Sequence, residues 1–577
     1  MRLHRSSAGL DPARLVPGED LVLSFPHGHG EELPFGVAIR DHLDPDERGE
    51  IDGLALRSLR RWRSMHDEQL TQAGICWPFI WEWELFAEVF LPVLGTAAAF
   101  GRALAAVEPK TVELHGLDAL SESIVRAVAG VRGVQPVTVR EPDTRSAAAA
   151  ESVNQTQTLR SRRAPAHRRA RRAVLQRAMS LGAPSHLAAD AVVMFSYWPM
   201  MPLLDRMLAE RRWRPAVVSQ SPPTGVGRSL RAAASGGWMG RPGPLELRRA
   251  HGELRTMITR LSDTSLILDG VELGALLDSG SLALARLRGA LDLATAAHWR
   301  RALGRGRARV VVVPFDHDPV ARLLVHLANE AGVPTVVFQH GAYVIPTELS
   351  DMTVAEHAAL WTPETAPPVS WSREPWLIGY PFAHDPPGTR QWSGGGHPRV
   401  AVLSQPCDRG RMLNDERDVM RHYATAVAAV AEALADAQIV LRPHPADDLR
   451  PALAVAGRSR RVEIDVSSDL LTLLAGCDLC IGGPSTATLQ SALVGTPAVV
   501  LNVTASEWRW PLGGATTVPI ARSHTELVHW SGRWLEGAVL PGREDLLAGL
   551  GATGGDASNR FLSHLARLSK NRTPGAR

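Results

Sequence analysis

Two short apolar runs of this 577-residue chain, 310–314 and 333–338, each give way to polar residues that could do chemistry. Asp316 and Asp318 follow the first run, and His340 follows the second. A histidine or a carboxylate placed at a reacting hydroxyl can take up its proton. We expect His340 or Asp316 to be a general base, with Asp318 as a further candidate. The alternatives are that Asp316 caps the following helix and that His340 is structural.

A second group of residues has the types that bind phosphate. Arg442 and His444 follow one strand-like run, and Gly483, Ser485 and Thr486 open a helix after another. Arginine offers a fork of N–H donors, glycine lets a ligand approach the backbone, and a helix start carries unpaired N–H groups. These residues predict a site for the phosphates of a donor. The alternatives are an ordinary helix cap at Ser485 and a structural histidine at His444.

Alternating strands and helices must position these groups. The expected strands are 111–114, 191–195, 215–219, 310–314 and 333–338, then 400–403, 439–441, 462–466, 479–481 and 498–501. Such alternation predicts parallel sheets, and residues that follow parallel strands gather at one edge of the sheet. We therefore expect an α/β chain with two Rossmann-like domains that face each other across a cleft.

The predicted parts are a mostly helical extension at 1–108, an acceptor domain at 109–385, a nucleotide-donor domain at 398–540 and a tail at 541–577. The extension holds six aromatic residues between Trp77 and Phe90, which we expect to pack against the next domain. A ligand- or membrane-facing aromatic surface is the alternative. His115 and Asp118 follow the first expected strand of the acceptor domain, where they could contact the acceptor or form a plain turn and helix cap.

The composition fits a globular, core-building chain, with 45% hydrophobic and 21% charged residues. A net charge of +3 gives no reason to expect a nucleic-acid partner. The segment from Arg160 to Arg177 carries eight arginines and no acid, so we expect a solvated insertion there or a surface that docks on anionic membrane lipid.

Four cysteines are too few for disulfides to stabilise a chain of this length. The first residues of the sequence lack the apolar run of a signal peptide. We expect a reduced, cytoplasmic protein, peripheral on the inner face of the membrane if the arginine-rich segment docks there. No transmembrane segment is expected, because the longest uncharged stretches are interrupted by proline and glycine.

Three segments together resemble a known group of enzymes. They are Gln339-His340-Gly341, Arg442-Pro443-His444-Pro445, and the stretch from Asp469 through Gly483-Pro484-Ser485-Thr486 to Gly495-Thr496-Pro497. In order and spacing they resemble bacterial GT-B transferases of surface polysaccharide, a group that includes capsule polysaccharide transferases, polysialyltransferase-like enzymes and CDP-glycerol glycerophosphotransferases. The resemblance covers about residues 305–505. It implies that His444, Ser485 and Thr486 contact the donor phosphates and that His340 is catalytic.

The resemblance implies transfer of a sugar or polyol phosphate from a nucleotide sugar or CDP-polyol to a hydroxyl of a carbohydrate or lipid-linked acceptor. His340 or an acidic residue would deprotonate that hydroxyl, while Arg442, His444 and the Ser485 helix start stabilise the leaving phosphate. This scheme requires no metal and no cofactor. The residues after Gly341 differ from the glycerophosphotransferase continuation, so the donor stays open.

Two other functions remain as alternatives. One is an isomerase that resembles the non-hydrolysing UDP-sugar 2-epimerases, and the other is a non-catalytic scaffold of polysaccharide assembly. A transferase turns over only with an acceptor, an epimerase needs none, and a scaffold shows no turnover.

Overall fold

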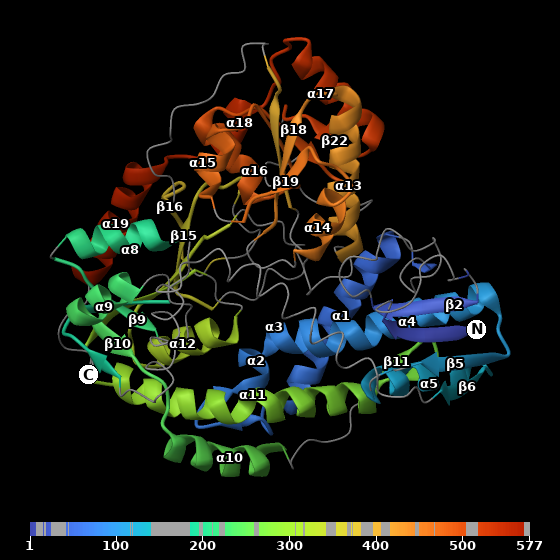
Figure 1. Ribbon diagram of the computed structural model, residues 1–577. Coiled ribbons are helices and arrows are strands. Elements are labelled where there is room, and N and C mark those ends of the chain that lie inside the picture. The colour runs from blue at the N-terminus through green and yellow to red at the C-terminus, as the bar shows by residue number, and fades with distance from the viewer. Residues whose placement is uncertain are drawn as a thin grey trace.

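The computed structural model describes residues 1–6, 16, 19–24, 42–43, 45–115, 117, 119–139, 185–195, 200–210, 212–218, 226–258, 265–305, 307–314, 318–341, 354–365, 371, 373–381, 396–404, 416–444, 449–466, 468–503 and 517–570. Three mainly parallel sheets, each with its helices, form an N-terminal, a middle and a C-terminal domain. In Figure 1 the C-terminal domain lies at the top, the middle domain at the lower left and the N-terminal domain at the lower right.

The middle domain is built on an eight-stranded sheet in the order β16-β15-β14-β13-β8-β9-β10-β7, in which only β7 pairs antiparallel. Its strands are β7 (His186–Leu187), β8 (Ala191–Met194), β9 (Arg214–Val218), β10 (Gly237–Met239), β13 (Ala308–Val313), β14 (Thr335–Phe338), β15 (His357–Leu360) and β16 (Trp376–Leu377). Every residue of β8, β14 and β15 is buried, as expected where helices cover both faces of a parallel sheet.

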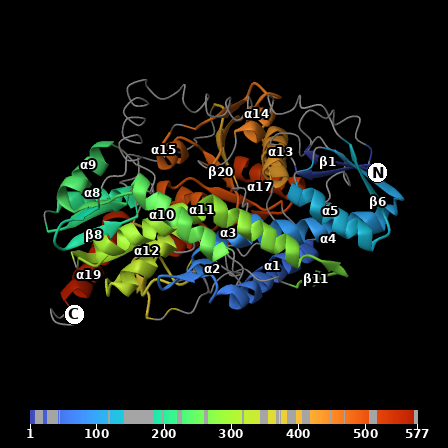
Figure 2. The same ribbon diagram turned by 90° about the horizontal axis from the view of Figure 1, so that it is seen from below.

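Five helices of this domain lie within the described residues. They are α8 (Met201–Ala209), α9 (Val226–Ser235), α10 (Pro244–Ile258), α11 (Gly274–Leu303) and α12 (Pro319–Glu330). The long helix α11 passes beneath both the middle and the N-terminal domain, and α10 packs along it (Figure 2). Helix α12 begins where the Asp318 carboxylate accepts hydrogen bonds from the backbone N–H groups of Val320 and Ala321. Because Pro319 lacks an N–H at the first helical position, nothing there is left unpaired.

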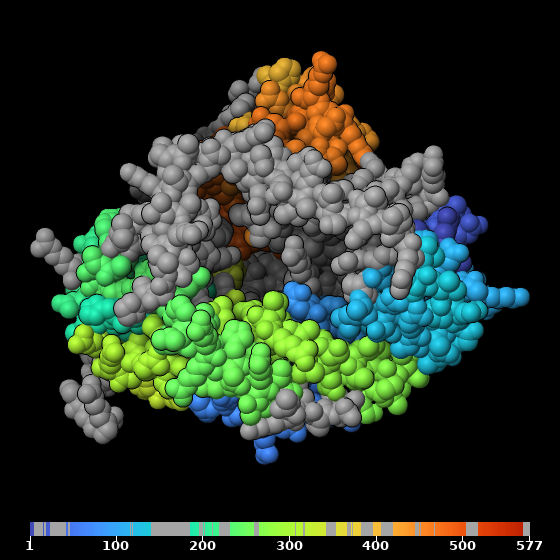
Figure 3. Space-filling model, turned by 60° about the horizontal axis from the view of Figure 1, so that its bottom comes forward, coloured from blue at the N-terminus to red at the C-terminus, as the bar shows by residue number. Residues whose placement is uncertain are grey.

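The C-terminal domain has a six-stranded, wholly parallel sheet in the order β19-β18-β17-β20-β21-β22. Its strands are β17 (Arg399–Leu403), β18 (Gln438–Arg442), β19 (Val462–Ile464), β20 (Leu479–Gly482), β21 (Ala498–Leu501) and β22 (Ile520–Ala521). Its helices are α13 (Glu416–Ala433), α14 (Arg450–Ala456), α15 (Leu470–Ala475), α16 (Thr486–Ser491) and α17 (His524–Leu535). The predicted fold class is confirmed: two Rossmann-like α/β domains, with a hollow between the C-terminal domain and the rest of the molecule (Figure 3).

The N-terminal domain differs from the prediction in one respect. Residues 45–107 are mostly helical, with α1 (Pro45–His66), α2 (Trp77–Ile80), α3 (Glu82–Leu85), a π-helical turn (Phe86–Phe90) and α4 (Leu91–Val107). A four-stranded parallel sheet accompanies them, in the order β2 (Asp20–Ser24), β1 (Arg2–Ser6), β5 (Thr111–His115) and β6 (Gln135–Val139), together with α5 (Ala119–Val131). Strand β5 was expected to open the sheet of the acceptor domain. It pairs instead with β1 and β6, because the start of the chain returns to supply its neighbour.

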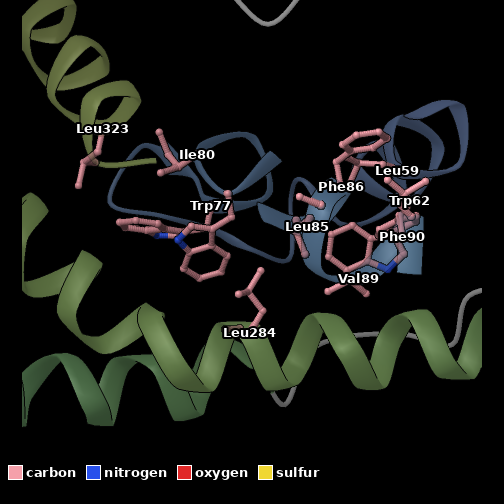
Figure 4. Close-up of a cluster of buried hydrophobic side chains, with 14 of the residues drawn as sticks. Leu59, Trp62, Trp77, Ile80, Leu85, Phe86, Val89, Phe90, Leu284 and Leu323 are labelled. Carbon is pink, nitrogen blue, oxygen red and sulfur yellow. The ribbon is translucent and has the colours of Figure 1, made fainter. Parts of the chain in front are cut away.

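The aromatic cluster packs into the core, as expected. Trp77, Trp81, Phe86 and Phe90 are each at most 2% exposed. Figure 4 shows Trp77 between Leu284 of α11 and the side chains of Ile80 and Leu323. Aromatic side chains therefore join the N-terminal helices to the middle domain.

One described helical stretch, Glu82–Val107, is long and apolar enough to cross a membrane by length and composition alone. Of its most apolar window, 67% is buried inside the protein. Helices α1 and α5 pack against α4, so this stretch is a core helix of the N-terminal domain.

The end of the chain returns to the middle domain. The segment expected to be a tail contains α18 (Arg543–Leu550) and α19 (Gly554–Lys570). On α19, Phe561 meets Phe338 of β14 edge to face at 4.7 Å between ring centroids. The Tyr380 N–H donates to the Ala552 carbonyl at 2.6 Å, and the Gly554 N–H donates to the Tyr380 carbonyl at 2.9 Å. Backbone hydrogen bonds therefore join the segment at Tyr380, which leads from the middle to the C-terminal domain, to the segment at 552–554, which leads back.

Candidate functional site

The segment that follows β14 is fixed by one buried glutamine. The Nε2 group of Gln339 donates to the carbonyls of Gly341 at 3.1 Å and Thr365 at 2.7 Å, and its Oε1 accepts from the Trp361 N–H at 2.7 Å. The Trp361 indole N–H donates to the Gln339 carbonyl at 2.9 Å. This network ties the carboxyl ends of β14 and β15 together, so the backbone on either side of His340 is held in place.

His340 is half-buried and its ring orientation is set by a backbone carbonyl. Its Nδ1 lies 2.7 Å from the Pro314 oxygen at the end of β13. Because a carbonyl only accepts, Nδ1 carries the proton, and the lone pair of the neutral ring is on Nε2. Burial lowers the pKa of His340 to about 4, against the opposing effect of the Pro314 hydrogen bond. At neutral pH this histidine is an uncharged imidazole whose Nε2 can accept a proton.

On the C-terminal side, the loop between β20 and α16 is closed by a threonine. The hydroxyl of Thr488 donates to the Gly483 carbonyl at 2.7 Å. Ser485 occupies the cap position of α16, yet its side chain accepts no hydrogen bond from the helix backbone. Its hydroxyl lies 3.5 Å from that of Thr488. The ordinary cap role considered for Ser485 is therefore not the role its side chain has in this structure.

The two domains bring these segments together. A Cβ atom placed on Gly341 would lie 3.4 Å from the hydroxyl oxygen of Thr486. Gly341 directly follows His340, and Thr486 begins α16. The carboxyl end of β14 therefore faces the start of α16, close enough that a Cβ atom at position 341 would contact the Thr486 side chain.

Arg442 is placed differently from the expectation that its charge is available to a phosphate. Its Nη1 lies 3.1 Å from an Asp465 carboxylate oxygen, and its Nη2 donates to the Ser468 carbonyl at 2.8 Å. These bonds tie the end of β18 to the segment after β19. Asp465 already compensates the charge of the guanidinium, so Arg442 supports the shape of this edge. His444, two residues beyond β18, is half-buried at the same edge of the sheet.

Each of the remaining predicted residues either has another place in the structure or falls outside the described residues. Asp316 and Asp118 are outside the described residues, as is the segment from Arg160 to Arg177. Asp318 is the cap of α12, and burial raises the pKa of its carboxyl. His115 ends β5 in the N-terminal sheet, where it stacks on His4 at 4.8 Å between ring centroids. It therefore belongs to a different sheet from His340.

Within the described ranges, no group of three or more His, Cys, Asp or Glu side chains could hold a metal ion.

No protein-family model and no curated protein sequence matches the chain. Solved structures with a similar arrangement include the UDP-GlcNAc 2-epimerase from Neisseria meningitidis, at 10% identity and a TM-score of 0.38, covering 66% of this chain and 100% of that one. The glycosyltransferase SnogD from Streptomyces nogalater is 16% identical with a TM-score of 0.35, covering 67% and 100%. The wall teichoic acid polymerase TagF is 11% identical with a TM-score of 0.36, covering 73% and 97%. All three TM-scores lie below 0.5.

Sequence reasoning missed the residues that hold the site in shape. The sequence pattern includes Gln339 only as a neighbour of His340, and it gives no functional role to Asp465 or Thr488. Gln339 directly follows the buried strand β14, and Asp465 directly follows β19, so the one local signal that could have marked them is a polar residue at the end of a strand. The bonds from Gln339 to Thr365 and Trp361, and from Asp465 to Arg442, join residues 22 to 26 positions apart, so these bonds cannot be read from spacing.

Proposed function

We propose that this protein is a glycosyltransferase of the GT-B type, which moves a sugar or polyol phosphate from a nucleotide-activated donor to a hydroxyl acceptor in surface polysaccharide or glycoconjugate synthesis. The observation that carries the proposal is the approach of Gly341 to Thr486 from opposite domains. It supports a site in which His340 accepts a proton on one side of a gap and the loop before α16 binds phosphate on the other side.

On the middle-domain side, His340 accepts the proton of the acceptor hydroxyl. An imidazole with a pKa of about 4 is a weak base when the gap holds no anion. The negative charge of a bound diphosphate nearby would raise that pKa, because an opposite charge favours the imidazolium form. Donor binding therefore prepares His340 to take up a proton. Asp316 remains the alternative base of this proposal.

On the C-terminal side, Gly483, Ser485, Thr486 and His444 bind the donor phosphates. The hydroxyl of Ser485 makes no cap bond to α16, so it can turn to donate to a phosphate oxygen. Arg442 acts by holding the edge of β18 in place through Asp465. The acceptor class, a carbohydrate or a lipid-linked hydroxyl, and the membrane contact through Arg160 to Arg177 are parts of the same proposal.

Calorimetric binding of CMP, CDP, UDP and GDP to the whole chain tests the donor site. We expect one nucleoside diphosphate to bind, and Ser485→Ala with Thr486→Val to weaken it about tenfold or more, because charge-assisted hydrogen bonds are lost. The matched control is Ser523→Ala, since Ser523 caps α17 in the same domain. This variant should bind the nucleotide as the wild type does.

Turnover then separates the three functions. Release of the nucleotide from its activated sugar only with an acceptor present supports the transferase. Conversion of the sugar without an acceptor would identify an isomerase. If no nucleotide binds, the donor site is wrong and a scaffold role replaces it.

A further inference from the structure

A separate cavity of about 440 Å³ lies where the start of α10 meets the end of α11. Helix α11 leads directly into β13, so this cavity lies at the amino edge of the eight-stranded sheet. His340 follows β14, which runs parallel to β13, and therefore lies at the opposite edge. The cavity is distinct from the candidate site described above.

The lining of the cavity has one more arginine than it has carboxylates. Glu246 accepts a hydrogen bond from the Gly243 N–H at 2.7 Å and pairs with Arg301. The carboxylate also lies 3.4 Å from Nδ1 of His298. Glu246 therefore occupies the start of α10 and neutralises Arg301. In the described part of the chain the second lining arginine, Arg305, has no ion-pair or hydrogen-bond partner, and Nε2 of His298 is buried without one.

The rest of the lining is apolar. Pro244, Leu245 and Ala302 contribute to the wall, and Leu245 is 79% exposed at the start of α10. A cavity of this volume, with apolar walls and a few convergent polar groups, is typical of small-molecule sites. A ligand that fits must cover Leu245 with an apolar part and bring a negative charge to Arg305.

We propose that this cavity binds a phosphate monoester that carries an acyl chain, supplied either as a membrane lipid or as a free molecule. The three oxygens of the phosphate match the guanidinium fork of Arg305 and the second ring nitrogen of His298. The acyl chain lies on Leu245 and Pro244. This site does not depend on the proposed transferase reaction, and its test does not require that reaction.

The test is calorimetric binding of dihexanoyl phosphatidic acid, below its micellar concentration, to the whole chain. Glycerol 3-phosphate and vesicles that contain phosphatidic acid are the comparison probes. We expect Arg305→Gln to weaken the short-chain lipid about tenfold or more, since one charge-assisted contact is lost. Leu245→Ser should weaken the short-chain lipid and leave glycerol 3-phosphate unchanged.

Arg249→Gln is the matched control. Arg249 is an exposed arginine of α10 that pairs with Glu253 and does not line the cavity, so its loss removes the same charge. Binding that Arg305→Gln weakens and Arg249→Gln does not supports the site, and vesicle binding with the same pattern identifies a membrane source. Equal loss in both variants shows surface charge alone and overturns the proposal. So does wild-type binding of glycerol 3-phosphate as tight as that of the lipid, or binding of no probe.

Discussion

Two histidines in different domains of this protein make the same kind of hydrogen bond and have similarly lowered pKa values, but they differ in solvent exposure. His340 in the middle domain donates to the Pro314 carbonyl after β13, and His422 on α13 donates to the Leu403 carbonyl at the end of β17. Burial lowers the pKa of each to about 4. His422 is fully buried, whereas His340 is half-buried beside a segment that faces the other domain.

The comparison shows that a shifted pKa does not by itself mark a catalytic group. Both shifts arise from desolvation, and both rings are neutral at pH 7. The difference lies in the second ring nitrogen. Nδ1 of His422 is buried and, among the described residues, has no partner, so no substrate reaches it. Nε2 of His340 is on a residue that solvent and a ligand can approach.

The largest expected effect is on turnover by His340→Asn. Loss of general base catalysis should lower kcat about 100- to 10,000-fold. Nucleotide binding and the midpoint of thermal unfolding should change little, because the half-buried ring contributes one backbone hydrogen bond. Steady-state kinetics and calorimetry measure these quantities. If the variant keeps the wild-type kcat, then His340 is not the general base and Asp316 takes that role in the proposal.

Gln339→Leu should have the next largest effect. It leaves the buried carbonyl of Thr365 and the buried N–H of Trp361 without partners, at a cost of about 1–3 kcal/mol each. We expect a lower free energy of unfolding and a lower kcat, since the segment that holds His340 loses its anchor. Urea denaturation and kinetics check this. A fall in stability with kcat unchanged would show that the network does not position His340.

His422→Ala should lower stability by about 2–3 kcal/mol through a cavity and an unpaired carbonyl, and leave kcat unchanged. The pH dependence gives a second readout. The folded protein holds the pKa of His422 at about 4, below its ordinary 6.5, so between these values the unfolded chain binds more protons. The stabilisation is complete above pH 6.5 and is lost as pH falls toward 4. The variant should show a flatter decline of unfolding free energy over this range.

Arg442→Gln should have the smallest effect. It removes the ion pair with Asp465, which is mostly buried, and we expect about 1–2 kcal/mol less stability with a modest change in nucleotide affinity. Asp465→Asn serves as the matched variant, because it breaks the same pair and leaves the arginine. If Arg442→Gln abolishes nucleotide binding while Asp465→Asn does not, then Arg442 binds phosphate directly.

Local patterns in the sequence were enough to place the strands of the two Rossmann-like domains. Short apolar runs followed by turns marked β13, β14, β20 and β21 close to their observed bounds. The partner of β5 was not predictable, because strand β1 lies about 110 residues earlier and pairing at that distance leaves no local trace. The same holds for α19, whose Phe561 packs on Phe338 across more than 200 residues.

For the candidate site too, part could be predicted from the sequence and part could not. The residue types at His340, Ser485 and Thr486 could be recognised from chemistry and from their place after strands. The neutral state of His340 and the neutralised state of Arg442 depend on Pro314 and Asp465, which come close only through folding. A charged side chain is available to a ligand only if no folded partner already neutralises it. The sequence alone does not show which partners those are.

Nitrogen-15 NMR of histidine-labelled protein tests whether His340 is a neutral base that responds to the donor, with His340→Asn and His422→Ala to assign the two rings. We expect both rings to titrate near pH 4, with the His340 proton on Nδ1. Adding the nucleoside diphosphate that binds should raise the pKa of His340 and leave that of His422 unchanged. Titration of His340 near pH 6.5, a proton on Nε2, or no response to the nucleotide would show that His340 is not the general base proposed here.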